Sequence, residues 1–169
     1  GYSPLPGLVM STRCGDLDPS IVLDLIERHG YSPQQVNRIL NQESGLVGLS
    51  GETSDLFELL QLVSETEDPR AKVAVDVYVH RLKTTIGSML AALGGADLLV
   101  FTDDIGVGAW QVREAACNGL EWFGLILDKE VNRSVARDRI ALLSAPSSTI
   151  QILSIPTDEE YIIAMEGLR

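Results

Sequence analysis

Residues 7–19, GLVMSTRCGDLDP, place a single arginine between glycines and a helix-start signal. Arg13 is followed closely by Asp16 and Asp18. A guanidinium on a loop binds carboxylate or phosphoryl oxygens through paired N–H donors, and neighbouring aspartates can fix it or tether a cation. The same spacing suits a loop salt bridge, which is the commoner arrangement. Arg13 is therefore a candidate anion-binding residue with a structural alternative.

Charge and composition exclude several classes of function. The 169 residues carry 13 basic and 24 acidic side chains, a net charge of -11, so nucleic acid is not expected as a partner. No apolar run approaches the roughly 20 residues of a membrane helix, which favours a cytoplasmic protein. Cys14 and Cys117 lack metal-ligand spacing and are expected to be free thiols. The length predicts one domain, residues 1–169.

Local start signals predict the first helices. Asp18 before Pro19 is an N-cap followed by a proline at the first helical position, and Ser32 with Gln35 is a capping box. The order resembles a DNA-binding helix-turn-helix, but the negative charge favours a structural role. The glycine-rich residues 45–55 are predicted to form a loop. Residues 69–93 are predicted to form one long, mostly buried helix, with His80 hydrogen-bonded on a packed face.

The second half of the chain alternates strands with helices. Short apolar runs at residues 96–102 and 149–155 predict two buried strands. A loop and a helix over residues 109–119 follow the first strand, and a last helix begins after Pro156. Helices outnumber strands, and helices separate the strands. The predicted fold class is α/β.

The opening of the chain resembles a known enzyme family. Residues 1–22, GYSPLPGLVMSTRCGDLDPSIV, are similar to the segment G-[FY]-[ST]-P-L-E-G-L-[VM]-M-G-T-R-[SC]-G-D-[IL]-D-P of the acetate and propionate kinases. Ser11 departs from the family, which usually has glycine there. The resemblance covers the whole chain but only the C-terminal half of a kinase. It implies the actin-like ATPase fold that sugar kinases share, with this chain as its C-terminal nucleotide-binding domain.

The resemblance also implies chemistry and partners. It gives Arg13 the role of stabilising the phosphoryl group in flight between ATP and a short-chain carboxylate, with Mg²⁺ as the metal. The carboxylate pocket and further phosphate contacts belong to an N-terminal half that this chain lacks, so the chain alone is not expected to turn over. The family further implies a homodimer.

The first nucleotide segment is altered. Residues 101–114, FTDDIGVGAWQVRE, line up with the family's FTGGIGENxxxVRE, whose glycine loop lies along the nucleotide. Asp103 and Asp104 replace both leading glycines, while Ile105 and Gly106 remain. Two carboxylates about 4 Å apart repel by on the order of 4 kcal/mol at an effective dielectric of about 20. Nucleotide affinity is expected to fall unless Mg²⁺ bridges the pair or the side chains point away.

A second segment borders the adenine site in the family. The family motif TSDxR reads here as residues 53–57, so Asp55 is kept and Phe57 replaces the arginine. Phe57 can stack on a base, although an apolar position on a helix face is the simpler interpretation. Asp55 and Phe57 are the predicted nucleotide contacts of this segment.

The third segment carries the metal ligand. Residues 155–160, IPTDEE, match the family's IPTNEE apart from Asp158. Thr157 and Glu160 suffice for a capping box. By the resemblance, Glu159 helps to hold Mg²⁺, a cation that selects carboxylate oxygens.

Two hypotheses follow. The chain is either the C-terminal domain of an acetate kinase-type phosphotransferase or a diverged, non-catalytic domain used for assembly. Arg13 and Glu159 favour the first. Phe57, Asp103 and Asp104 favour the second.

Overall fold

The computed structural model describes residues 1–167, and residues 159–162 by their backbone only. The chain forms two compact units, Gly1–Thr85 and Ile86–Arg169. Helix α5 (Pro69–Leu93) is continuous across the boundary between them. Within the described residues, helices build the first unit, and the second combines helices with a small sheet.

The first unit begins with a long loop and two capped helices, α1 (Pro19–Glu27) and α2 (Pro33–Gln42). The Asp18 carboxylate accepts from the amide of Ser20 at 2.8 Å. Ser32 and Gln35 form the reciprocal capping box of α2. Both helix starts are confirmed. They were predictable because each cap joins groups only two or three residues apart.

Residues 45–50 form helix α3 (Gly45–Ser50), where the sequence predicted a loop. The amides of Leu46 and Val47 donate to the carbonyl oxygens of Met10 and Ser11 at 2.9 and 3.1 Å. The first amides of any helix lack an acceptor inside it, so these carbonyls stabilise a segment whose glycines disfavour helix. The loop prediction is wrong because the acceptors lie far away in the sequence.

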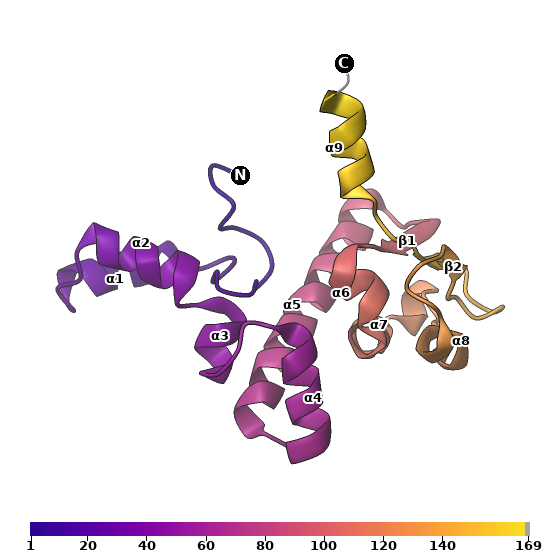
Figure 1. The fold of residues 1–169 in the computed structure, drawn as a ribbon, viewed down its shortest axis with the longest axis horizontal. Coiled ribbons are helices and arrows are strands. Elements are labelled where there is room, and N and C mark those ends of the chain that lie inside the picture. Colours follow the sequence, from indigo (N-terminus) through magenta and orange to yellow (C-terminus); the bar gives the residue numbers. More distant parts are fainter. Residues whose placement is uncertain (168–169) are drawn as a thin grey trace. The chain divides into compact units, whose positions relative to one another are not determined.

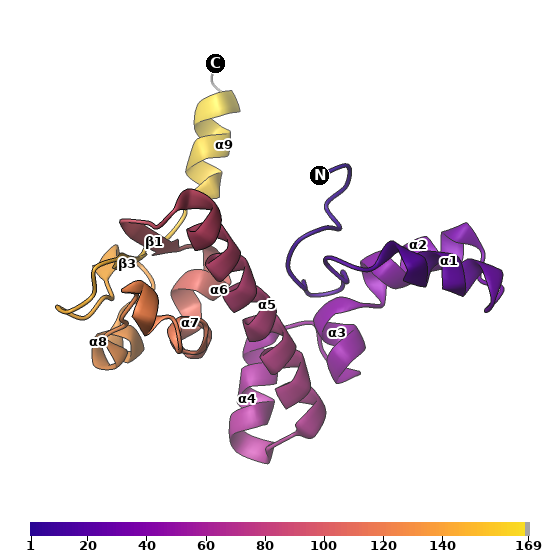
Figure 2. The same ribbon diagram turned by 180° about the vertical axis from the view of Figure 1, so that it is seen from behind.

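Helix α4 (Leu56–Thr66) runs beside the first turns of α5, and a tight turn at Glu67 and Asp68 joins them (Figures 1 and 2). Asp68 accepts from the amide of Ala71 at 2.6 Å, which fixes the start of α5. Apolar side chains of α3, α4 and α5 supply fully buried positions of this unit, namely Leu46, Leu56, Leu59, Ala71 and Ala74.

The long helix is confirmed over its predicted length, but it is not mostly buried. Val73 is 51% exposed, and His80 is exposed rather than packed. The prediction is wrong here because the buried positions of α5 are few: Ala71, Ala74, Ile86 and Leu90. Among the described residues, no helix, α5 included, has the length and apolar character that a membrane span requires.

The second unit contains a three-stranded sheet with strand order β1-β3-β2. Strand β1 (Leu98–Phe101) pairs in parallel with β3 (Gln151–Ser154), and the two-residue β2 (Ala141–Leu142) pairs antiparallel with β3. Both predicted strands form, but the prediction that both are buried is wrong for β1, which lies at the edge of the sheet and is only partly covered. Central β3 buries Ile152 completely, whereas β1 leaves Leu98 45% exposed.

Short helices accompany this sheet (Figures 1 and 2). The described residues form α6 (Asp103–Gly108), α7 (Trp110–Cys117), a 3-10 turn (Glu121–Phe123), α8 (Lys129–Ser134) and α9 (Glu159–Gly167). Helices α7 and α9 confirm the predictions. Residues 103–108 were predicted as a loop, and that prediction is wrong because they form helix α6. The contacts that stabilise this helix are described with the site below.

Replacing Gly45 with alanine is expected to destabilise the first unit. Gly45 has a φ of +66°, and an added Cβ would collide with the carbonyl oxygen of Met10. We expect a loss of about 1–3 kcal/mol in unfolding free energy from backbone strain and weakened amide–carbonyl bonds. Urea unfolding followed by circular dichroism measures this loss.

The matched control is Gly87→Ala. Gly87 lies inside α5, and apart from its chain neighbours and the nearby helix backbone no atom lies within 4 Å of the added Cβ. Alanine there should raise stability by up to about 1 kcal/mol through helix propensity alone. Equal unfolding midpoints for the two variants would contradict the close approach at Gly45.

Candidate functional site

Asp16 closes the loop that carries Arg13. Its carboxylate accepts from the amide of Gly7 at 2.8 Å, and its own amide donates to the Gly7 carbonyl at 3.0 Å. Arg81 of α5 lies 3.4 Å from the same carboxylate. Asp18 caps α1 instead. The expectation that these two aspartates fix the Arg13 guanidinium is wrong, because the Gly7 amide and Arg81 bind Asp16, and the Ser20 amide binds Asp18.

The backbone around Arg13 is held on both sides. The carbonyl of Arg13 accepts from the amide of Met10 at 3.1 Å, and the amide of Cys14 donates to the Leu40 carbonyl at 3.0 Å. The Thr12 carbonyl accepts from the amide of Ser44 at 3.1 Å, just before α3. These bonds involve three separate segments, so the position of Arg13 is set by tertiary contacts.

The Arg13 side chain keeps one donor without an internal partner. Its Nε is buried, and no hydrogen-bond acceptor for it lies among the described residues. Leaving such a donor unsatisfied costs about 1–3 kcal/mol, and guanidinium donors suit carboxylate and phosphoryl oxygens. The geometry is therefore compatible with anion binding at Arg13.

Cys14 is next to Arg13 but is not prepared to act as a nucleophile. Burial raises the pKa of its thiol above the ordinary value, and the charge of Asp16 acts in the same direction. Its Sγ donates to the Gly15 carbonyl at 3.1 Å. Neither Cys14 nor Cys117 forms a disulfide, as predicted. A protonated thiol at neutral pH is a poor nucleophile.

Asp55, a predicted nucleotide contact, has a complete structural role. Its carboxylate accepts from the amides of Phe57 at 2.7 Å and Glu58 at 3.4 Å, and so caps α4. Phe57 is half-buried in the first turn of that helix. Nucleotide contact by either side chain stays a prediction.

The segment predicted as the nucleotide loop begins with an unusual backbone conformation. Asp103 has a φ of +63°, a region that favours glycine, which is the residue the family has here. Its carboxylate accepts from the amide of Asp104 at 2.7 Å. Both aspartates are exposed, Ile105 is half-buried, and an added Cβ at Gly106 would lie 3.1 Å from the backbone of Phe101. Their contact with nucleotide stays a prediction.

A buried polar pair behind this segment was missed as a site feature by sequence reasoning. Arg113 and Asn132 are each 1% exposed, and Arg113 Nε donates to Asn132 Oδ1 at 2.6 Å. Arg113 also donates to the carbonyls of Gly106 and Val107 in α6, which explains the helix found there. The sequence signal that could have indicated this pair is the V-R-E triplet at residues 112–114, which matches the family segment.

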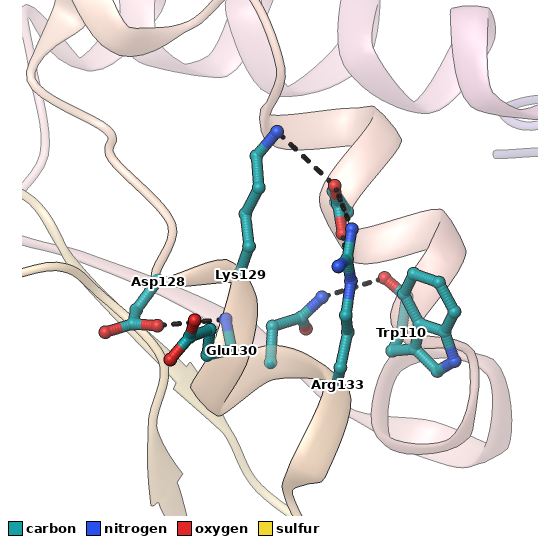
Figure 3. Close-up of polar contacts among 7 residues, drawn as sticks. Trp110, Asp128, Lys129, Glu130 and Arg133 are labelled. Carbon is teal, nitrogen blue, oxygen red and sulfur yellow. Dashed lines mark hydrogen bonds and ion pairs between the residues drawn. The ribbon is translucent and has the colours of Figure 1, made fainter.

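The surface beside this pair carries a separate ionic cluster (Figure 3). Arg133 binds Glu114 through Nε and Nη2 at 3.2 and 3.0 Å, and Lys129 lies 3.4 Å from Glu114. The Arg133 guanidinium also lies 5.1 Å from the ring centre of Trp110. These exposed pairs connect α7 with α8.

The predicted metal ligand lies outside the description, because the side chain of Glu159 is not among the described atoms. Among the residues that are described, no group of three or more His, Cys, Asp or Glu side chains could hold a metal ion. Magnesium is often bound by one or two carboxylates together with substrate phosphates and water. Metal binding by Glu159 stays a prediction.

The candidate residues fall into two groups. Arg13, Asp55 and Phe57 belong to the first unit, and residues 103–106 belong to the second. Within the first unit, α3 and its neighbours position Arg13, while Asp55 is fixed by its own helix.

Comparison with known proteins identifies the family. A sequence profile described as the acetokinase family matches residues 1–165. The chain belongs to the acetokinase family. An acetate kinase of Rippkaea orientalis is 46% identical over 168 residues, which cover 98% of this chain and 40% of that protein. An acetate kinase of Solibacter usitatus is 43% identical over 169 residues, which cover 100% of this chain and 41% of that protein.

Solved acetokinase structures agree. The crystal structure of acetate kinase from Entamoeba histolytica matches with a TM-score of 0.90 and 44% identity, covering 99% of this chain and 43% of that one. The Porphyromonas gingivalis acetate kinase gives a TM-score of 0.91 at 37% identity, and the match covers 98% of this chain and 41% of that one. The chain thus spans about 40% of the length of the acetate kinases it matches.

Asp55→Ala is expected to destabilise α4 by about 1 kcal/mol, since two amides lose their cap. Asp55→Ser, which keeps a capping oxygen, should stay near the unmodified chain. Thermal unfolding of both variants measures the difference. Equal losses in alanine and serine variants would show that the capping bond is not what Asp55 contributes.

Proposed function

We propose that this chain supplies nucleotide, Mg²⁺ and transition-state contacts to an acetate kinase-type phosphotransferase, which transfers a phosphoryl group from ATP to acetate. It would act as the C-terminal nucleotide-binding domain of an actin-like ATPase fold, in a cytoplasmic homodimer. The observation that carries the proposal is Arg13: a buried Nε without an internal acceptor, on a loop held by tertiary bonds, within the family's own motif.

Phosphoryl transfer needs little covalent chemistry from the protein, so positioning and charge neutralisation supply the rate. Arg13 would donate to the equatorial oxygens of the phosphoryl group as negative charge spreads over them. Glu159 would help to hold Mg²⁺, which neutralises phosphate charge when bound. Residues 103–106, with Asp55 and Phe57, would border the nucleotide.

The isolated chain is not expected to turn over. It spans about 40% of the length of its relatives, and we assign the carboxylate pocket to the remainder of the enzyme. A propionate kinase of Francisella tularensis also matches, with a TM-score of 0.89 at 34% identity over 98% of this chain and 41% of that one, so the proposed substrate class is a short-chain carboxylate, acetate or propionate.

A non-catalytic assembly domain is the second candidate. Asp103 supports it, because its carboxylate occupies the amide of Asp104 and adds negative charge where the family leaves backbone N–H groups open. Phe57 supports it as well, since the family's arginine is gone. In this case the chain would self-associate without binding nucleotide, which sedimentation equilibrium with and without ADP would detect.

Calorimetric titration with ATP and with ADP, each with Mg²⁺, tests the first candidate. The unmodified chain is expected to bind in the micromolar to low-millimolar range, roughly -8 to -4 kcal/mol. The double variant Asp103→Gly/Asp104→Gly should bind more tightly, because two like charges leave the loop.

The control is Asp138→Asn, which removes an exposed charge from the same unit that is paired with its neighbour Arg139. It should leave nucleotide affinity unchanged. If the unmodified chain gives no binding heat and the double variant does, the result would favour the assembly domain. If neither the unmodified chain nor the double variant gives binding heat, the result would count against nucleotide binding altogether.

A further inference from the structure

Arg113 is a fully buried cation on α7 that no step of the proposed reaction uses. Its guanidinium makes four hydrogen bonds: to Asn132 Oδ1 at 2.6 Å, to the Asn132 carbonyl at 2.9 Å, and to the carbonyls of Gly106 and Val107 at 2.8 and 2.9 Å. All four acceptors are neutral. Burial accordingly lowers the pKa of Arg113 from its ordinary value.

Two of these bonds end on α6. A helix leaves its last four carbonyls without internal partners, and α6 has only six residues. Nη1 of Arg113 binds two of these carbonyls at once. Carbonyl dipoles at a helix C-terminus favour a cation, so the buried charge and the short helix stabilise each other.

Asn132 fixes the other side of the guanidinium. Its Nδ2 donates to the carbonyl of Trp110 at 3.0 Å, at the first residue of α7. A single buried pair therefore joins the end of α6, the start of α7 and helix α8. The guanidinium cannot shift toward solvent without breaking several bonds in a buried place, where each unsatisfied group costs about 1–3 kcal/mol.

We propose that Arg113 is a positioning residue for the nucleotide: by clamping the Gly106 and Val107 carbonyls, it sets the placement of residues 103–106. The proposal rests on the nucleotide role proposed above for that segment. Arg113 touches no ligand in this scheme. Its contribution is to keep α6 formed, so that the residues at the start of α6 have one conformation before nucleotide arrives.

Arg133 provides a matched comparison. It lies on α8 next to Asn132, and its bonds go to Glu114 of α7 rather than to α6 (Figure 3). Its side chain is 53% exposed. Arg133→Met therefore removes an arginine from the same neighbourhood while leaving the Arg113 clamp in place.

The experiment compares the unmodified chain with Arg113→Met, Arg113→Lys and Arg133→Met. Two quantities are measured: hydrogen exchange of the amides of residues 105–109, and the dissociation constant for ADP with Mg²⁺. Arg113→Met should speed exchange in α6 and weaken ADP binding by at least about tenfold, because hydrogen bonds from a charged donor are lost. Arg133→Met should change neither quantity.

Lysine at position 113 gives the rescue test. An ammonium can still donate to carbonyls of α6, but it lacks the fork that also reaches Asn132. ADP affinity should therefore fall in the order arginine, lysine, methionine. A merely structural role would lower the melting temperature of Arg113→Lys without this ordering. If Arg113→Met does not fold, Arg113→Gln takes its place in the same order.

The results separate this proposal from the proposed function. If α6 exchange in the Arg113 variants equals that of Arg133→Met, the clamp is overturned. If exchange rises while ADP affinity holds, the positioning role is overturned and nucleotide binding stands. If the unmodified chain binds no ADP, the proposed function fails, and a role for Arg113 in nucleotide binding fails with it.

Discussion

The backbone bonds between residues 10–12 and the start of α3 are the constraint on which the first unit depends. Three carbonyl oxygens of one loop accept the amides that begin α3. The same bonds hold Arg13, which lies next in the chain. Loop and helix therefore stabilise each other: the helix amides need external acceptors, and the loop needs fixed donors. Gly45 is required where the two backbones approach, since any side chain there would meet the Met10 carbonyl.

In the second unit, the groups that need external partners are the carbonyls at the C-terminal end of a helix. Arg113 of α7 donates to carbonyls at the end of α6. At the start of α3, by contrast, the helix amides donate to carbonyls of the loop. Both helices have six residues, too few to be stable alone in water. Both also carry or adjoin candidate residues of the acetokinase site. Their placement thus depends on partners distant in sequence, which ties the candidate residues to the packing of each unit.

Sequence reasoning succeeded where the controlling groups are neighbours in the chain. The caps at Asp18 and Ser32 were readable because each side-chain oxygen serves an amide within three residues. The parallel strands were readable from short apolar runs between loop signals. The same reasoning missed α3 and α6, which glycine content indicated as loops. It also placed His80 on a packed face, although burial on α5 is restricted to a few positions.

By itself, the sequence determined the family, the long helix α5, the two longer strands and the residues that carry the kinase motifs, because local caps, periodicity and motif identity are properties of neighbouring residues. Only the tertiary structure decided that Asp16 binds Arg81, that Arg13 keeps a buried donor without an internal acceptor, and that Arg113 clamps α6. These are bonds between distant segments, and a hydrogen bond depends on distance and angle in space rather than on separation along the chain.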